Sequence, residues 1–399
     1  FIGAAFLLLS ASIIQPVSAQ SIIPQPESIT RQQGTFTLAK GLQGVTNLKG
    51  KDFKILNQYT SDVMNIPFSS VKNPSADAPL RLICTGTAQE AAMAADSVSL
   101  QGYELNVTPT AVTIQARTPM GLFYGLQTLR QLEKDRQIPC VKITDTPRFA
   151  YRGLMIDCSR HFWWSDEIKK QLDAMAYFKL DRFHWHLTDN QAWRFEVKAF
   201  PRLTSARSMT RHQGLFYNQE ECRELSAYAR RYGISIIPEL DMPGHSAAFT
   251  RAMGFPMQSE QGIDCLKQAL NELCAVFPDA PYIHIGGDEA DNMPPDFLRV
   301  MIEHIHGLGR RAVVWVPTKG DFTGVDMVQL WSSAGHLVPG IPNIDCRYNY
   351  VNHFDTFADI VGIYRSNIYG RPKGSQELAG EISAVWNDHR LHSARDILL

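Results

Sequence analysis

Residues 151–187 read YRGLMIDCSRHFWWSDEIKKQLDAMAYFKLDRFHWHL, and this stretch decides the fold. Its two ends contain short apolar runs, Arg152–Ile156 and Phe183–Leu187, which have the length of buried strands. The segment between them, Ser165–Phe178, fits a helix that Ser165 could cap, with acidic residues in the first turn. A strand, a helix and a second strand in this order form the repeating unit of parallel α/β folds.

The same alternation continues along the chain after Pro147. Further helices fit Gln219–Arg231, with Asn218 as a cap, and Pro294–Gly307. Further strand-like runs are Ser235–Pro238, Ile283–Ile285, Ala312–Val316, Met327–Trp331, Asp345–Tyr348 and Ile382–Trp386. Eight such units predict a (β/α)8 barrel of the TIM type, which needs about 250 residues. Residues 146–399 supply about this length, although the Gly- and Pro-rich connection Ser332–Asn343 leaves no room for a full helix.

Residues 20–145 predict a small α/β domain without a cluster of chemically active side chains. The strand-like runs Tyr103–Val107 and Ala111–Ala116 are close enough to form a hairpin, and Leu80–Cys84 is a third strand. Leucines recur at helical spacing in Met120–Glu133. We expect this domain to be a packing partner of the barrel.

The ends of the chain carry two further expectations. Residues 1–19 resemble a signal peptide that lacks its n-region, because Ile2–Val17 is apolar and Val17-Ser18-Ala19 fits a cleavage site; a buried strand is the alternative. We therefore expect a bacterial protein exported to the periplasm or the medium, with no membrane anchor evident. The chain stops at Leu399 where an eighth helix should run, so we expect a truncated C-terminus.

Composition excludes some partners. A formal net charge of -1 argues against nucleic acid and against anionic membranes bound by charge. The seven cysteines are odd in number and irregularly spaced, which fits neither a disulfide framework nor a zinc motif. We favour buried thiols; a single bridge remains possible, and Cys265 with Cys274 is the nearest pair. The oligomeric state stays open.

Polar and aromatic residues gather where the predicted barrel strands end, which is where such barrels hold their active sites. They are Asp157, Arg160, His184, His186, Asp189, Trp193, Glu239, Asp241, His245, Asp288, Glu289, Trp315, Trp331, Tyr350, Asn352, Trp386 and Asp388. Core packing would not collect so many charged groups. Flat indoles cover the apolar faces of sugar rings, and carboxylates bind their hydroxyls, so the set suits an uncharged carbohydrate.

The run His284–Ala290, HIGGDEA, places two carboxylates side by side. Glycoside cleavage needs an acid that protonates the leaving oxygen and a second group that supports the positive centre. Glycines before the pair let the backbone leave the strand, so both carboxyls could reach one substrate. We expect Glu289 to be the acid and Asp288 to lie beneath the C2 substituent, with their repulsion raising one pKa.

Several long motifs resemble the family 20 glycoside hydrolases, the β-N-acetylhexosaminidases. The likeness covers nearly the whole mature chain, and its segments are SIIPQPESI (21–29), GLFYGLQTLRQL (121–132), YRGLMIDCSRHFW (151–163), FHWHLTDNQAWR (183–194), IIPELDMPGH (236–245) and HIGGDEA (284–290). The resemblance implies an exo-acting retaining hydrolase that removes terminal N-acetylhexosamine, GlcNAc or GalNAc, from glycans without a cofactor or metal. The substrate's own 2-acetamido oxygen would attack, giving an oxazolinium intermediate, so no enzyme carboxylate bonds to the sugar.

The resemblance also implies roles for single residues near the reacting centre. Glu289 matches the acid/base, and Asp288 matches the group that orients the acetamido N–H. Tyr350 matches a donor to the acetamido oxygen. Asp189 and His245 match partners that support the carboxylate pair.

The remaining matches concern the sugar ring. Trp315 and Trp331 match walls around the acetamido methyl group, and Trp386 matches the platform under the ring. Arg160 matches the residue that holds O3 and O4, and Asp388 the acidic residue that accepts O4 or O6.

Two departures from the family pattern leave specificity open. The chain has Asp189-Asn190-Gln191-Ala192 where the family often has Asp-Asp-Gln-Gly, and it has Asn352 where Asp is common. Asn352 could still bind hydroxyls because an amide both donates and accepts. The preference between GlcNAc and GalNAc, the linkage and the natural glycan stay open.

Three other functions compete with this one. A metal-dependent hydrolase could use His184, His186, His245 and an Asp as ligands. A carbohydrate-binding protein without catalysis would share the tryptophans. A related enzyme could release a larger terminal unit such as a disaccharide.

Overall fold

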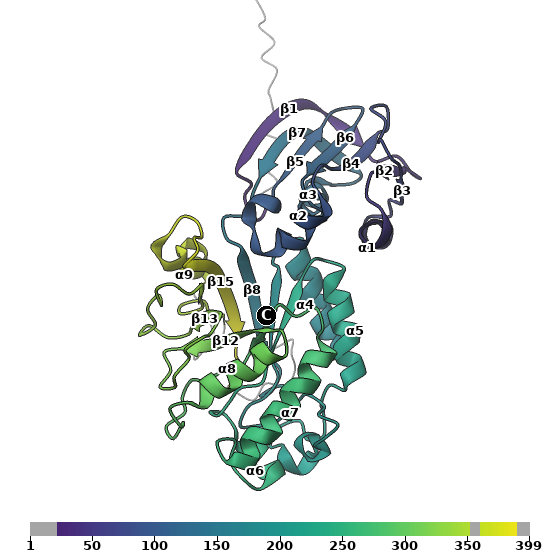
Figure 1. Cartoon of the computed structure of the whole chain (residues 1–399). Helices are drawn as coiled ribbons and strands as arrows, with labels where there is room; N and C mark the ends of the chain where they lie inside the picture. Colours follow the sequence, from purple (N-terminus) through teal and green to yellow (C-terminus); the bar gives the residue numbers. More distant parts are fainter. Residues whose placement is uncertain (1–21, 352–359, 389–399) are drawn as a thin grey trace, which may run out of the picture.

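The computed structural model describes residues 22–351 and 360–388, which form two domains stacked end to end (Figure 1). The predicted signal peptide (1–19), Asn352 and the predicted C-terminal truncation lie outside these residues. The first domain is an open sheet with helices, and the second is a closed parallel barrel. The predicted fold class is thus confirmed.

Within the described residues, the first domain has a seven-stranded sheet in the order β1-β7-β5-β6-β4-β2-β3. Its strands are β1 (Ser28–Thr37), β2 (Gly44–Thr46), β3 (Phe68–Ser70), β4 (Leu80–Cys84), β5 (Tyr103–Val107), β6 (Val112–Ala116) and β7 (Gln137–Asp145). Its helices are α1 (Gly50–Met64), α2 (Ala88–Met93) and α3 (Pro119–Leu132), with the 3-10 turns η1 (Ala94–Asp96) and η2 (Val98–Leu100). β5 and β6 pair antiparallel, so the predicted hairpin is confirmed.

The second domain closes in the order β10-β11-β12-β13-β14-β15-β8-β9, which gives eight parallel strands within the described ranges. They are β8 (Tyr151–Asp157), β9 (Arg182–His186), β10 (Ser235–Glu239), β11 (Tyr282–His284), β12 (Arg311–Val316), β13 (Met327–Leu330), β14 (Asn343–Asp345) and β15 (Leu378–Val385). Nearly every residue of these strands is buried, because one face lines the barrel interior and the other packs against helices and loops.

Two of the predicted strands were placed imperfectly. β14 begins at Asn343, whereas the sequence predicted Asp345–Tyr348. The strand ends where Arg347 turns back and binds the carboxylate of Asp345 at 2.9 Å, so the chain leaves the sheet there. β15 begins at Leu378, four residues before the predicted start at Ile382, because Gly380 and Glu381 hide its apolar pattern.

The helices outside the barrel are α4 (Ser165–Tyr177), α5 (Gln219–Arg230), α6 (Ala247–Met253), α7 (Glu260–Val276), α8 (Phe297–Gly307) and α9 (Ile360–Arg365), with η3 (Pro201–Thr204), η4 (Ala206–Ser208) and η5 (Ile368–Gly370). Asn218 caps α5 as predicted, by accepting from the Glu221 N–H at 2.9 Å. The prediction that Ser165 caps α4 was wrong, since the N-cap is Trp164. The described chain contains no helix in 331–342, as expected, and none in 317–326. None of the described helices is both long and apolar enough to span a bilayer.

Charged contacts join the first domain to the barrel. Asp96 in η1 lies 3.5 Å from Arg182 at the start of β9 and 3.2 Å from Arg311 at the start of β12. The buried Lys179, just before β9, lies 3.3 Å from the Asp145 carboxylate at the end of β7. All three barrel residues are at or before the N-terminal ends of strands, so the first domain covers that end of the barrel.

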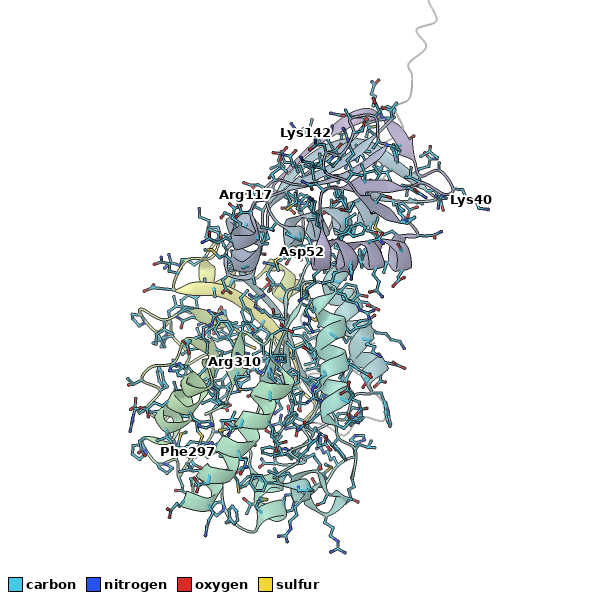
Figure 2. The ribbon with its side chains drawn as sticks, turned by 45° about the vertical axis from the view of Figure 1, so that its right-hand side comes forward. Lys40, Asp52, Arg117, Lys142, Phe297 and Arg310 are labelled. Carbon is cyan, nitrogen blue, oxygen red and sulfur yellow. The ribbon has the colours of Figure 1, made fainter. Side chains whose placement is uncertain are left out.

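The opposite end of the barrel is therefore the one that holds the strand C-termini. Figure 2 shows Phe297, at the start of α8, far from the first domain, and Arg310, just after α8, closer to it. α8 thus runs back toward the first domain, and β11, which precedes it, runs away. The loop between β11 and α8, which carries Asp288 and Glu289, lies at the end remote from the first domain.

The seven cysteines all lie in the described ranges and are free thiols. Six of them are buried, and Cys84 is half-buried. The predicted buried thiols are thus largely confirmed, and Cys265 is not bridged to Cys274. Burial raises the pKa of Cys274 to about 11, so this thiol stays protonated and unreactive at neutral pH.

Candidate active site

The backbone leaves β11 through two glycines that no other residue could replace without strain. Gly286 has φ 67° and Gly287 has φ 105°, both in the left-handed region. A Cβ atom on Gly286 would overlap the carboxylate of Asp241. Glu289 itself has φ 47°, which a non-glycine residue adopts at a cost of about 1 kcal/mol or more. The strained backbone of this turn therefore places Asp288 and Glu289 just beyond the end of β11.

Asp288 has a buried, unsatisfied acceptor. Its Oδ1 atom is inaccessible to solvent and accepts no hydrogen bond from the described residues. Burial raises the pKa of Asp288 to about 6, and the charge of Glu239 adds to the rise, whereas the charge of His245 opposes it. The sequence predicted that repulsion between the two carboxylates would raise one pKa; the pKa of Asp288 is raised, but burial is the main cause and the charge of Glu289 contributes little. A carboxylate in this state favours a ligand that donates a hydrogen bond.

His245 lies between two carboxylates. Its Nε2 atom is 3.3 Å from Glu289, and its Nδ1 atom is 3.6 Å from Asp189. Burial lowers the pKa of His245, but the close contact with Asp189 and the charges of nearby aspartates outweigh it and raise the pKa to about 10. The Glu289 side chain is 56% exposed, so its outer face is open to a leaving group. The structure therefore joins Asp189, His245 and Glu289 in one chain of contacts.

Arg160 ties a second cluster of carboxylates together. Its guanidinium contacts Asp157 at 3.0 Å, Asp189 at 2.8 Å and Asp388 at 3.6 Å. It also lies 5.1 Å from the ring centre of Trp386. Burial disfavours the charged form, but the three carboxylates outweigh this cost and raise the pKa of Arg160 above its ordinary value. The rigid fork can still offer N–H groups to sugar hydroxyls.

Three tryptophans and one tyrosine come from successive strand ends. Trp315 is buried, and its ring centre lies 6.0 Å from that of Trp386. Tyr350 lies 6.1 Å from Trp386 and donates to the Trp331 carbonyl at 2.9 Å. The Trp331 indole donates to the carbonyl of Pro317 at 3.0 Å. These aromatic side chains thus form one contiguous group.

Asp241 is a residue that the sequence analysis noted after β10 but did not assign to the site. It is buried, and its Oδ1 accepts from the Gly287 N–H at 3.4 Å. Burial and the charge of Asp288 raise the pKa of Asp241 well above its usual range, although His245 lowers it. The position of Asp241 two residues after β10 was the signal, but its contact with the next loop depends on barrel closure.

The departure at Asn190 has a structural role. Its side-chain oxygen accepts from the backbone N–H of Ala247, the first residue of α6, at 3.1 Å. Its own N–H donates to Asp189 at 2.6 Å. Asn190 therefore holds the loop after β9 against the start of α6.

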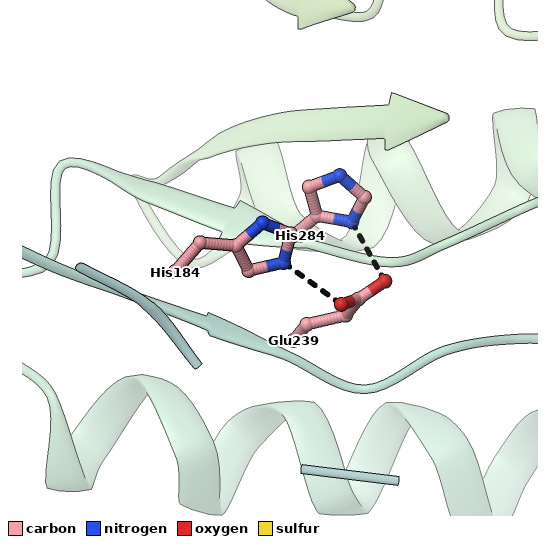
Figure 3. A group of neighbouring side chains, drawn as sticks. All are labelled: His184, Glu239 and His284. Atoms are coloured by element: carbon pink, nitrogen blue, oxygen red, sulfur yellow. Dashed lines mark hydrogen bonds and ion pairs between the residues drawn. The ribbon is translucent and has the colours of Figure 1, made fainter. Parts of the chain in front are cut away.

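The histidines of the metal-site alternative are hydrogen bonded to one carboxylate. His184 Nε2 lies 2.8 Å and His186 Nδ1 lies 2.6 Å from the same oxygen of Glu239. Figure 3 shows dashed lines that join the carboxylate of Glu239 to His184 and to His284. Among the residues that the structure describes, three groups have ligand atoms close enough together for an ion: His184 with Glu239 and His284, His186 with Asp189 and Asp241, and Asp241 with His245 and Asp288. Most of the ligand atoms in these groups already take part in hydrogen bonds or ion pairs within the protein.

Comparison with known families decides the relationship. A model described as "Glycosyl hydrolase family 20, domain 2" matches residues 19–146, and one described as "Glycosyl hydrolase family 20, catalytic domain" matches residues 149–261. The chain belongs to glycosyl hydrolase family 20. The resemblance predicted from the sequence is thereby confirmed.

Curated relatives of this family 20 protein are longer than the matched chain. A beta-hexosaminidase of Porphyromonas gingivalis is 39% identical over 227 residues, which are 47% of this chain and 29% of the relative. A beta-hexosaminidase of Vibrio furnissii is 28% identical over 375 residues, which are 77% of this chain and 59% of the relative. The chain thus spans less than two thirds of the length of these relatives.

Solved structures share the architecture of this family 20 protein. The beta-N-acetylhexosaminidase of Bacteroides fragilis has a TM-score of 0.79 at 27% identity, covering 92% of this chain and 86% of the other. The Streptomyces plicatus N-acetyl-beta-hexosaminidase, in complex with Thio-NAglucal, has a TM-score of 0.78 at 25% identity, covering 94% and 87%.

Proposed function

We propose that this family 20 protein is an exo-acting retaining β-N-acetylhexosaminidase. It removes terminal non-reducing GlcNAc or GalNAc from glycans through an oxazolinium intermediate formed by the substrate's own acetamido group. The observation that carries the proposal is the buried, unpartnered Oδ1 of Asp288 beside an exposed Glu289. A plain glucoside offers no amide N–H to satisfy that acceptor, whereas a 2-acetamido sugar does.

The two carboxylates divide the chemistry. Glu289 protonates the departing glycosidic oxygen and then takes a proton from the water that opens the intermediate. Asp288, as a carboxylate, accepts the acetamido N–H and balances the positive charge that develops on the amide nitrogen as its oxygen attacks. His245 keeps a positive charge near Asp288, which favours the ionised form of that carboxylate.

The sugar is held by two groups of side chains, the carboxylate cluster around Arg160 and the aromatic group of tryptophans with Tyr350. Arg160 binds O3 and O4 and Asp388 binds O4 or O6, while Trp386 lies under the ring. Trp315 and Trp331 enclose the acetamido methyl group, and Tyr350 donates to its oxygen when the hydroxyl turns away from the Trp331 carbonyl. Support comes from the contacts that already fix these side chains, so little conformational entropy is lost on binding. Asn352, proposed at the same end, lies outside the described residues.

The relatives support the substrate class. The curated relatives carry the name beta-hexosaminidase, and the Streptomyces plicatus enzyme was solved with Thio-NAglucal. Export to the periplasm or medium is part of the proposal and rests on the sequence of residues 1–19. Cell fractionation of the bacterial host, with and without this segment, tests that part.

The test compares 4-nitrophenyl N-acetyl-β-D-glucosaminide, the corresponding galactosaminide and the plain β-glucoside, with and without EDTA. Release of nitrophenol from the acetamido sugars only, unchanged by EDTA, supports the proposal. Similar cleavage of the plain glucoside would refute the acetamido nucleophile. Loss of activity with EDTA, restored by zinc, would favour the metal-dependent alternative. If the folded protein cleaves neither acetamido sugar but releases a disaccharide, the enzyme that releases a larger terminal unit replaces the proposal. If it only binds glycans, the carbohydrate-binding function replaces it.

A further inference from the structure

Glu239 is a buried carboxylate with three clear hydrogen-bond donors. It ends β10 inside the barrel and has no exposed surface. Its Oε1 accepts from the indole N–H of Trp315 at 2.8 Å. Its Oε2 lies 2.8 Å from His184 Nε2 and 2.6 Å from His186 Nδ1. Because an isolated buried charge is costly, these donors are what allow the carboxylate to stay ionised.

The other imidazole beside Glu239 does not compete for this role. His284 Nδ1 lies 3.2 Å from Oε1, as drawn in Figure 3, but the same nitrogen accepts from the Gly286 N–H at 3.1 Å. A nitrogen that accepts cannot also donate to the carboxylate. Trp315 is therefore the clear donor to Oε1, and its indole orientation depends on Glu239.

Contacts between groups of alternating charge connect the Oε2 atom of Glu239 to Glu289, the proposed acid/base. His186 bonds Glu239 through Nδ1 and Asp189 through Nε2, the latter at 3.0 Å. An imidazole that donates from both nitrogens to carboxylates is protonated. Asp189 in turn contacts Arg160 and His245, and His245 contacts Glu289.

We infer that Glu239 is a positioning residue that fixes both halves of the site, the Trp315 wall through Oε1 and the Asp189–His245–Glu289 chain through a protonated His186 on Oε2. This inference rests on the proposed function. Its physical basis is that one rigid carboxylate sets the distance between the wall that holds the acetamido group and the group that protonates the leaving oxygen. Errors of about 1 Å in such a distance cost about 100-fold in rate.

Glu239→Gln tests the inference without changing side-chain size. The amide has one acceptor oxygen, so it cannot serve Trp315 and the histidines together, and it lacks the charge that holds His186 protonated. We expect kcat/KM on the acetamido glycoside to fall about 100-fold. The alkaline limb of the pH profile should also move to lower pH, because His186 now loses its proton more easily. A loss of stability alone would not move that limb.

Two further variants serve as controls: one changes the Oε1 contact with Trp315, and the other changes neither contact of Glu239. Trp315→Phe keeps a flat aromatic ring but removes the indole N–H and part of the wall, so it should raise KM and leave the alkaline limb in place. Glu381→Gln removes a half-buried barrel carboxylate on β15 that faces Asn349 instead, and it should leave kcat, KM and the pH profile unchanged.

NMR of the wild-type protein gives an answer even if the variant does not fold. With ¹⁵N-labelled histidine, His186 should show two ring N–H protons at pH 8, assigned through its contact with the Trp386 ring at 5.1 Å. A neutral His186 at pH 8, or an unmoved alkaline limb in a folded Glu239→Gln protein, would overturn the inference. An inactive, folded wild type would instead refute the proposed function, since the NMR result does not depend on turnover.

Discussion

The Nε2 atom of His245 lies 3.3 Å from a carboxylate oxygen of Glu289. This contact orients one oxygen of Glu289 toward the protein and leaves the other side of the carboxyl group exposed. In the proposed mechanism, the proton that Glu289 gives to a leaving group would thus be carried at the open side of the site, next to a positive charge that stabilises the carboxylate left behind.

Glu289→Gln removes the proposed acid and keeps the contact with His245. We expect kcat on 4-nitrophenyl N-acetyl-β-D-glucosaminide to fall by about 10²–10⁴-fold with little change in KM. A 2,4-dinitrophenyl glycoside, whose leaving group needs little protonation, should show a much smaller loss in the first step. Equal losses on both substrates would contradict a role as acid.

We expect the raised pKa of Asp288 to set the acid limb of activity. With a pKa of about 6, Asp288 becomes protonated as the pH falls below that value and can no longer accept the acetamido N–H. We expect kcat/KM to fall about tenfold per pH unit below pH 6. Asp288→Asn should have low activity and lack this limb. A wild-type limb near pH 4 would assign it to another group.

His245 makes stability depend on pH in a defined direction. Its folded pKa of about 10 exceeds the ordinary 6.5, so the folded state binds the proton more tightly. The stabilisation is fully present below pH 6.5 and is lost as the pH rises through 10. Urea midpoints should fall between pH 7 and 10, and less steeply in His245→Gln. Parallel curves for the two proteins would show that His245 does not contribute.

Gly286→Ala tests the turn after β11. The new Cβ would overlap Asp241 and keep φ at 67°, so we expect a loss of at least about 2 kcal/mol in the free energy of unfolding. Gly307→Ala is the matched control, because a Cβ there meets nothing and α8 should gain about 0.5 kcal/mol. Equal midpoints in chemical denaturation for the two variants would refute the steric argument.

The domain contact can be tested at Asp145. Removing this carboxylate in Asp145→Ala leaves the buried Lys179 ammonium without its charged partner, and we expect a loss of about 3 kcal/mol. Asp291→Ala breaks an exposed ion pair with Lys319 and should leave the free energy of unfolding nearly unchanged. Thermal denaturation of both variants measures the difference.

The sequence predicted elements whose pattern is local. β4 and β5 were placed to the residue because their apolar side chains alternate or cluster between turn signals. β1 was missed because eight of its first nine residues are exposed, so the edge strand has no apolar pattern. Its place in the sheet depends on β7, about 100 residues later in the chain, which local patterns do not reveal.

The same limit applies to the site. The sequence predicted that the residues after each strand meet at one end of the barrel, and these include Asp288, Glu289, His245 and Arg160. The contact of Asp241 with Gly287 joins two loops, and the hydrogen bond of Glu239 with Trp315 joins two strands. Such contacts depend on how the strands are staggered when the barrel closes. The spacing of residues within one segment does not specify this stagger.

The closed barrel also sets when the chain can finish folding during synthesis. β8 pairs with β9 on one side and with β15 on the other, so its second edge stays open until the last strand has left the ribosome. An open edge of a strand is a template for pairing with other chains. The first domain, which ends at β7, is complete before β8 emerges, so it can fold while that edge of the barrel is still open.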